Sequence, residues 1–171
     1  HSDPARDHVL AATAGAEVVD AAPGLVLGVA GTLVEVASVL DTGAPPPGLE
    51  LASSQENDGS VVTRIDTGEV VVLAPGDVEE AGQAALLRSG ADLRADVLVV
   101  PHHGSADQSA DLLAAVAAPI ALIGVGEDND YGHPAPSALG LLARAGAAVH
   151  RTDTQGSIAV AWAGDHWAVT T

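Results

Sequence analysis

The sequence predicts an α/β fold in which helices are layered on mixed β-sheets. Short apolar runs alternate with helical segments along the 171 residues, an alternation typical of a layered α/β domain. Pairs of extended runs joined by brief polar breaks add hairpins to this pattern. Three polar clusters, built around Asp77, His102-His103 and His133, follow apolar runs and indicate where strands end.

The N-terminal half predicts one helix followed by extended strands. Residues 7–15 carry helical signals, and residues 25–40 are rich in Val and Leu, which predicts one or two strands. The extended runs 60–65 and 69–73 flank Asp66-Thr67-Gly68, a turn sequence that indicates a short hairpin.

The C-terminal half alternates strands with helices and closes with a hairpin. The run 95–100 is apolar throughout, as expected of a strand that is covered on both faces. A helix over 137–145 has Pro136 beside its start and Gly146 past its end, the positions that these residues favour. The other predicted elements are helices over 79–88 and 110–117, strands over 120–125 and 147–150, and a hairpin of strands over 157–162 and 166–170.

Composition limits the chemistry that this chain can perform. Because there is no cysteine, a metal ion would have to be held by His, Asp, Glu or Asn. The formal net charge is −17, from 23 acidic residues against 6 arginines, with no lysine. Passive binding of nucleic acid is disfavoured, since phosphate contacts depend on Lys and Arg patches. A polyanionic substrate would need metal ions or a partner domain to supply positive charge.

The length and the first residue bear on the organisation of the parent protein. The length fits a single domain over residues 1–171. No apolar run approaches the roughly 20 residues that a membrane-spanning helix needs. The chain begins at His1 rather than Met, and we therefore expect it to be part of a longer protein.

Asp77 and the paired histidines each support a functional interpretation and a plainer one. Asp77 follows the apolar run 70–73, and α/β sites collect ligands at the carboxyl ends of strands. Alternatively, Asp77 caps the next helix, with Glu80 completing a capping box. His102 and His103 also follow a strand, where neutral imidazole binds metal and imidazolium donates a proton or binds an oxyanion. Their alternative is a polar surface turn.

The remaining histidines are less specific. His133 lies between Gly132 and Pro134, and a polar loop with turn residues accounts for it as well as a functional role does. His150 and His166 are predicted to be structural or exposed, although His150-Arg151 could reach a phosphate. An aspartate and three histidines at the same end of adjacent strands are what a hydrolytic metal site requires.

The order of these strings resembles the ComEC competence family, and specifically its C-terminal metallo-β-lactamase-like domain. The resemblance covers about residues 3–160, and its strings are specific together although each alone is weak. They are, in order, Asp7-His8, Ser60-Val61-Val62, Gly76-Asp77, His102-His103-Gly104-Ser105, Asn129-Asp130-Tyr131-Gly132-His133-Pro134 and Arg151-Thr152-Asp153-Thr154-Gln155-Gly156.

The resemblance implies an αββα sandwich with a metal site at one edge of its sheets. It implies a soluble domain of a bacterial cytoplasmic-membrane protein, on the external face, whose membrane channel imports single-stranded DNA during natural transformation. The domain would be a metal-dependent nuclease that takes single- or double-stranded DNA and degrades the strand that is not transported. It implies no small-molecule cofactor.

The resemblance also implies roles for individual residues. Asp7 and His8 match the last two positions of the superfamily's HxHxDH motif, as ligands of one zinc or manganese ion. His133 completes that metal, and Asp77 matches an aspartate that bridges two metals, so that one ion or two are implied. His102 and His103 match paired histidines that protonate the leaving oxygen or bind phosphate, with a direct ligand role as the alternative.

This chain departs from the family pattern in three respects. The earlier histidines of HxHxDH fall on Asp3 and Ala5, or on His1 and Asp3 in another alignment. The superfamily's middle histidine has no counterpart, since Asn57 or Asp58 occupies that region. The strands that normally precede the motif are also expected to be lacking.

Three functions therefore follow from the sequence. The first is a metal-dependent phosphodiesterase of a DNA-uptake channel. The second is a catalytically degenerate domain that serves the same channel as a structural or docking module, which the departures and the acidic charge favour. The third is a hydrolase of the same fold that acts on a small ester.

Overall fold

The computed structural model describes residues 15–16, 19–40 and 53–171. Residues 7–14 of the helix predicted over 7–15, Asp7 and His8 among them, lie outside the described residues. In the described part of the chain, no helix is long and apolar enough to cross a membrane.

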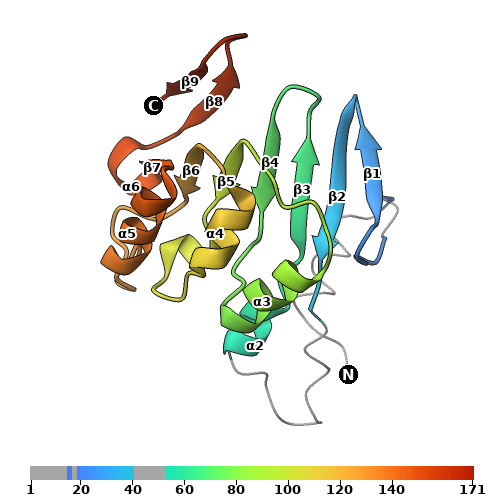
Figure 1. The fold of residues 1–171 in the computed structure, drawn as a ribbon, viewed down its shortest axis with the longest axis horizontal. Coiled ribbons are helices and arrows are strands. Elements are labelled where there is room, and N and C mark those ends of the chain that lie inside the picture. The colour runs from blue at the N-terminus through green and yellow to red at the C-terminus, as the bar shows by residue number, and fades with distance from the viewer. Residues whose placement is uncertain (1–14, 17–18, 41–52) are drawn as a thin grey trace.

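A seven-stranded mixed sheet organises the molecule, with its strands in sequence order from β1 to β7 (Figure 1). The first four strands are antiparallel neighbours, and β4 to β7 are parallel. A separate two-stranded sheet follows. The strands are β1 Val26–Val29, β2 Thr32–Ser38, β3 Val62–Asp66, β4 Val71–Ala74, β5 Val97–Val99, β6 Ile120–Ile123 and β7 Ala148–Arg151, with β8 Ala159–Trp162 and β9 Trp167–Thr170 in the second sheet.

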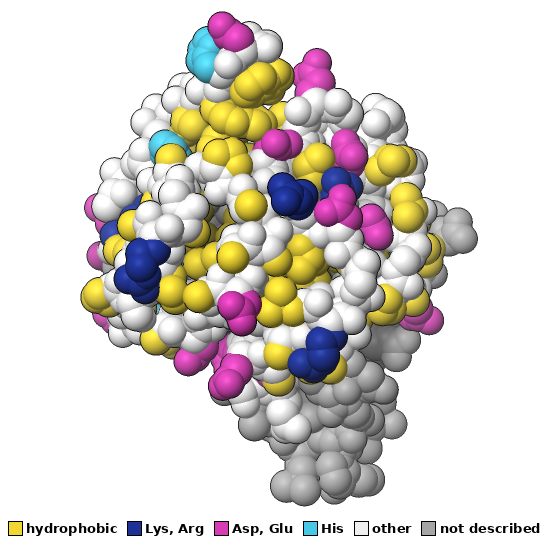
Figure 2. Space-filling model, viewed as in Figure 1, with side chains coloured by type: hydrophobic (Ala, Val, Ile, Leu, Met, Phe, Trp, Pro, Cys, Tyr) yellow, Lys and Arg dark blue, Asp and Glu magenta, His cyan; other side chains and the backbone are white. Residues whose placement is uncertain are grey.

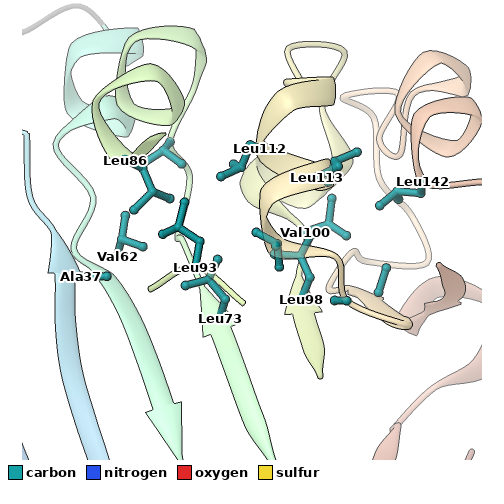
Figure 3. Close-up of a cluster of buried hydrophobic side chains, with 14 of the residues drawn as sticks. Ala37, Val62, Leu73, Leu86, Leu93, Leu98, Val100, Leu112, Leu113 and Leu142 are labelled. Atoms are coloured by element: carbon teal, nitrogen blue, oxygen red, sulfur yellow. The ribbon is translucent and has the colours of Figure 1, made fainter. Parts of the chain in front are cut away.

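Three helices pack on one face of the large sheet. They are α3 Glu80–Arg88, α4 Ala110–Val116 and α5 Pro136–Ala145, while the short helices are α2 Ser53–Asp58, the 3₁₀ turn η1 Pro101–Gly104 and α6 Thr152–Gln155. Figure 3 shows Leu86, Leu112 and Leu142 of the three long helices beside sheet residues such as Leu73 and Leu98. Burial of these apolar side chains is the main favourable term that holds the layers together.

Strand register explains why this face forms the core. Leu73, Leu98, Ala121 and Val149 are paired across β4 to β7, so their side chains share one face. The alternate residues, among them Val72, point to the other face, on which α3, α4 and α5 do not pack. The predicted mixed α/β architecture is confirmed; the described residues hold one large sheet and a small hairpin.

Local signals set several of the element boundaries. The predicted turn at Asp66-Thr67-Gly68 joins β3 to β4, and the Gly68 amide donates to the Asp66 carboxylate at 2.8 Å. Helix α5 begins at Pro136 and ends at Gly146, which has φ 80°. These are the residues that pre-set a helix start and permit a left-handed end.

Candidate functional site

The site lies where the parallel strands β4, β5 and β6 end. The segments that follow these strands bring Asp77, His102, His103 and His133 to the wall of one pocket of about 830 Å³. The structure therefore brings these four residues to the lining of one pocket. Carboxyl ends of parallel strands share one edge of a sheet, which is why residues 56 positions apart can line a common pocket.

The paired histidines occupy an unusual backbone conformation. His102 (φ 46°, ψ 47°) and His103 (φ 54°, ψ 22°) are left-handed, as is Gly104 with φ 78°. For a residue with a Cβ this conformation costs roughly 1–2 kcal/mol. Such strain persists where surrounding structure enforces it, and it gathers at functional sites. The strain favours a functional interpretation of the His102-His103 segment over a plain surface turn.

Hydrogen bonds and close packing hold this turn in place. The His102 amide donates to the Gly76 carbonyl at 3.1 Å, which ties the turn to the Asp77 segment. The Ala135 amide donates to the Gly104 carbonyl at 2.8 Å. A Cβ on Gly104 would lie 2.8 Å from the Cβ of Pro134, so the two histidine-bearing segments approach as closely as only glycine allows.

His103 and Asp77 form the first pair of polar groups in the pocket. His103 Nδ1 lies 2.6 Å from the Gly124 carbonyl oxygen, which can only accept, so Nδ1 carries the proton. In the neutral ring, Nε2 then has a free lone pair, and it lies 3.6 Å from Asp77 Oδ1. An imidazole that donates one N–H to a carbonyl and offers its other nitrogen is the usual arrangement of a metal-binding histidine. This geometry is compatible with a direct ligand role for His103.

Asp77 does not cap the next helix, so that alternative interpretation is wrong. Helix α3 begins at Glu80, and its N-cap residue Glu79 makes no side-chain cap bond. Instead the buried Asp58 carboxylate accepts from the amides of Glu79 and Gly82, both at 2.8 Å. The Asp77 amide donates to Ser60 Oγ at 3.1 Å, and the Asp77 carboxylate faces the pocket.

Glu79 is a site residue that sequence reasoning missed. Its Oε1 lies 3.3 Å from His102 Nδ1, at ion-pair distance, although the angles fall outside hydrogen-bond geometry and His102 Nδ1 is buried without a hydrogen-bond partner. The same oxygen accepts from Asn57 Nδ2 at 2.7 Å. Asn57 and Asp58 therefore support Glu79 and α3, and neither lines the pocket in place of the middle histidine.

His133 carries an unsatisfied nitrogen beside the other two histidines. Its Nδ1 is buried without a hydrogen-bond partner, and its ring lies edge-on to His102 with centroids 5.3 Å apart. Burial lowers the pKa of His133, and the neighbouring His102 and His103 lower it further against the opposing effect of Asp107. Neutral imidazole is the form that binds metal.

The segment that begins at Arg151 closes the pocket wall rather than supplying a phosphate ligand. Arg151 Nε donates to Asp153 Oδ1 at 3.0 Å, and its guanidinium makes a second bond to the same carboxylate. Thr152 Oγ1 accepts from the Val125 amide and donates to the Val125 carbonyl, both at 2.7 Å. Thr152 lines the pocket, whereas Arg151 does not. His166 is exposed and paired with Asp165, as its terminal position predicted.

The donor types suit a metal ion, but the described donors are an incomplete set. Asp77 oxygen, His103 Nε2 and the unpartnered His133 Nδ1 are oxygen and nitrogen ligands of the kind that zinc or manganese takes. Within residues 15–16, 19–40 and 53–171, however, no three His, Asp or Glu side chains come together closely enough to hold an ion. A metal here would need ligands from outside these ranges.

The charge around the site is unfavourable for direct contact with a polyanion. On the face shown in Figure 2 the arginines are scattered among acidic side chains and form no basic stripe. The pocket itself is lined by three aspartates, Asp77, Asp128 and Asp130, and by no arginine. Positive charge at this site would have to come from protonated histidine or from a bound cation.

Comparison with known proteins shows sequence similarity to two competence proteins. No protein-family model matches the sequence, and no solved structure gives a significant match. The chain is 34% identical over 121 residues to ComE operon protein 3 of Bacillus subtilis (strain 168), which covers 70% of this chain and 15% of that protein. It is 32% identical over 111 residues to Competence protein ComA of Neisseria gonorrhoeae, covering 64% of this chain and 16% of that protein. The chain is thus similar to a part of each of these larger competence proteins.

Proposed function

We propose that this chain is a metallo-β-lactamase-like domain of a ComEC-type DNA-uptake protein. It would act as a metal-dependent phosphodiesterase that degrades the DNA strand that is not transported. Its partial similarity to two competence proteins supports the setting. The observation that supports the reaction is that Asp77, His103 and His133 line one pocket, where His103 Nε2 lies 3.6 Å from Asp77 Oδ1 and His133 Nδ1 has no hydrogen-bond partner.

Asp7, His8, Asp77 and His133 would hold one zinc or manganese ion, or two with Asp77 as the bridge. A bound divalent ion lowers the pKa of its water and offsets the charge of a phosphodiester. This second effect matters here because the chain carries a net charge of −17 and would otherwise repel DNA. His103 is an additional ligand candidate, on the geometry of its two nitrogens.

The paired histidines would handle the proton and the phosphate. With His102 Nδ1 directed at Glu79, Nε2 is the nitrogen that His102 offers to the pocket. A nearby carboxylate holds an imidazole in one orientation. His102 is therefore our choice for the group that protonates the leaving oxygen, and His103 for a ligand or phosphate contact.

The proposal places the domain on the external face of the cytoplasmic membrane, attached to the channel part of its own parent protein. The channel would present the strand that is to be degraded. Because no arginine lines the pocket, delivery by the channel would replace electrostatic capture of DNA at this site.

Metal binding and DNA cleavage test this proposal directly. Isothermal titration of the 171-residue chain with Zn²⁺ or Mn²⁺ should give saturable binding that Asp77→Asn abolishes. Asp111→Asn, an exposed carboxylate in the first turn of α4, is the matched control and should bind as the parent does. A labelled oligonucleotide should be cleaved only with metal. A folded chain that binds neither ion would overturn the proposal.

A catalytically degenerate docking domain is the second candidate. It is favoured because no three described donors converge on one position and because Asp3 and Ala5 replace histidines of the motif. It predicts no cleavage of single- or double-stranded DNA with any divalent ion. Cleavage that disappears in His102→Ala would refute it.

A further inference from the structure

We propose that Tyr131 is a stacking platform for an unpaired nucleobase at the mouth of the pocket. The inference rests on the proposed phosphodiesterase function and deepens it by naming how the substrate is held. It assigns the base to the Tyr131 side of the pocket and the phosphate to the histidine side. A strand would then be recognised by its bases, which compensates for the lack of arginine in the pocket lining.

Tyr131 is exposed in a place where a ligand would cover it. The side chain is 87% exposed, and it belongs to the set of residues that line the pocket with His133 and Asp77. It is the one tyrosine in the chain, which has 2% aromatic residues. Covering an aromatic ring removes a large apolar area from water, so a ligand with a flat face gains most here.

The backbone that carries the ring is held in position before any ligand arrives. The Tyr131 amide donates to Asn129 Oδ1 at 2.9 Å, and Asn129 Nδ2 donates to the His133 carbonyl at 2.6 Å. One amide side chain thus ties the backbone of Tyr131 to that of His133. Their rings are nearly parallel, at 13° with centroids 6.3 Å apart. A loop backbone that is already held in place loses less conformational entropy when a base stacks on the ring that it carries.

The neighbouring charges favour a base over a phosphate at this position. Asp128 and Asp130 flank the loop, line the pocket and are exposed. Carboxylates repel phosphate oxygens, but they accept hydrogen bonds from the amino groups on base edges. Bases inside a duplex are already stacked on their neighbours, so the platform would select single strands or frayed ends.

A titration with molecules that cannot be cleaved as phosphodiesters tests the platform separately from catalysis. Backbone amide shifts of the ¹⁵N-labelled chain are followed by NMR with Zn²⁺ present, during addition of 2′-deoxycytidine 5′-monophosphate or deoxyribose 5-phosphate. The nucleotide should bind roughly tenfold more tightly than the sugar phosphate, as expected for one base–aromatic stack. Tyr131→Ala should remove that difference, and Tyr131→Phe should keep it.

Trp162→Ala provides the matched control, because Trp162 is an exposed aromatic on β8 that does not line the pocket. It should leave the preference for the nucleotide unchanged. Equal affinities for the two ligands, no binding of either, or a preference that survives Tyr131→Ala would overturn the inference. If the preference holds while oligonucleotides are not cleaved, the platform stands and the phosphodiesterase function fails.

Discussion

The parallel half of the sheet and the antiparallel half differ in both packing and chemistry. In β4 to β7, Leu73, Leu98 and Ala121 are buried beneath α3, α4 and α5. In β1 and β2, by contrast, Val29 and Leu33 are 65% and 50% exposed. All four predicted site residues that the structure describes follow strands of the parallel half. A site that needs several side chains fixed at once lies on the part of the fold whose core is best packed.

Shortening an apolar side chain should reduce the free energy of unfolding much more in the parallel half than in the antiparallel half. This is the largest effect that we expect. Leu112→Ala removes a fully buried side chain from α4 and should cost about 2–5 kcal/mol of unfolding free energy. Leu33→Ala, on the exposed surface of β2, should cost less than about 0.5 kcal/mol. Urea denaturation followed by circular dichroism measures both. Equal costs would contradict the difference in packing.

The close packing of the His102-His103 segment against the His133-Pro134 segment should depend on Gly104. Gly104→Ala adds a Cβ 2.8 Å from Pro134 at a position with φ 78°, so it should destabilise the chain by roughly 2 kcal/mol. Gly164→Ala is the control: φ is 95° there but no atom lies within 4 Å, so only the backbone strain of about 1 kcal/mol remains. Thermal unfolding of both variants gives the comparison, and identical losses would show that the close approach does not matter.

The Glu79 carboxylate, which faces His102 beside the parallel strands, should affect DNA cleavage more than stability. Glu79→Gln keeps the shape but loses the charge that faces His102, and DNA cleavage should fall about tenfold with little change in stability. Glu80→Gln, one residue along and exposed on α3, should leave cleavage unchanged. The kcat and KM of an oligonucleotide substrate are the measurements. A loss confined to KM would mean that Glu79 acts on binding rather than on the proton donor.

The smallest expected effect concerns pH and the Arg151–Asp153 pair. Hydrogen bonds from Arg151 lower the pKa of Asp153 in the folded state. The pair therefore stabilises the folded state at pH values above the ordinary carboxyl pKa. This contribution is lost as the pH falls through the lowered pKa. Asp153→Asn should cost less than about 1 kcal/mol at pH 7, and the difference from the parent should shrink at acid pH. Urea midpoints at pH 7 and at about pH 2.5, below the ordinary carboxyl pKa, test this; a gap that widens on acidification would contradict it.

Much of the fold could be predicted because its signals are local. The Asp66-Thr67-Gly68 turn, the limits of α5 and the alternation of apolar runs with helices depend on residues that are neighbours in sequence. Boundaries moved by a few residues: the strand predicted over 120–125 is β6, Ile120–Ile123, because the chain turns at Gly124 to form the pocket wall.

The candidate site was predictable only in part. Asp77, His102, His103 and His133 could be grouped because each follows a strand, and parallel strands end at one edge. Asp77 could equally have been a helix cap, since an acid before a helix is the usual sign of one. The cap is instead Asp58, which lies 21 residues before Glu79 in the sequence.

The sequence by itself determined the order of the strands and helices and the four polar residues that follow the parallel strands, because propensity, turn chemistry and hydrophobic pattern act over short stretches. Only the tertiary structure decided which face the helices cover, that His102 and His103 are left-handed, and that Glu79 faces His102 while Asn57 holds Glu79. These features depend on contacts between distant segments, and no local pattern encodes the distance between them.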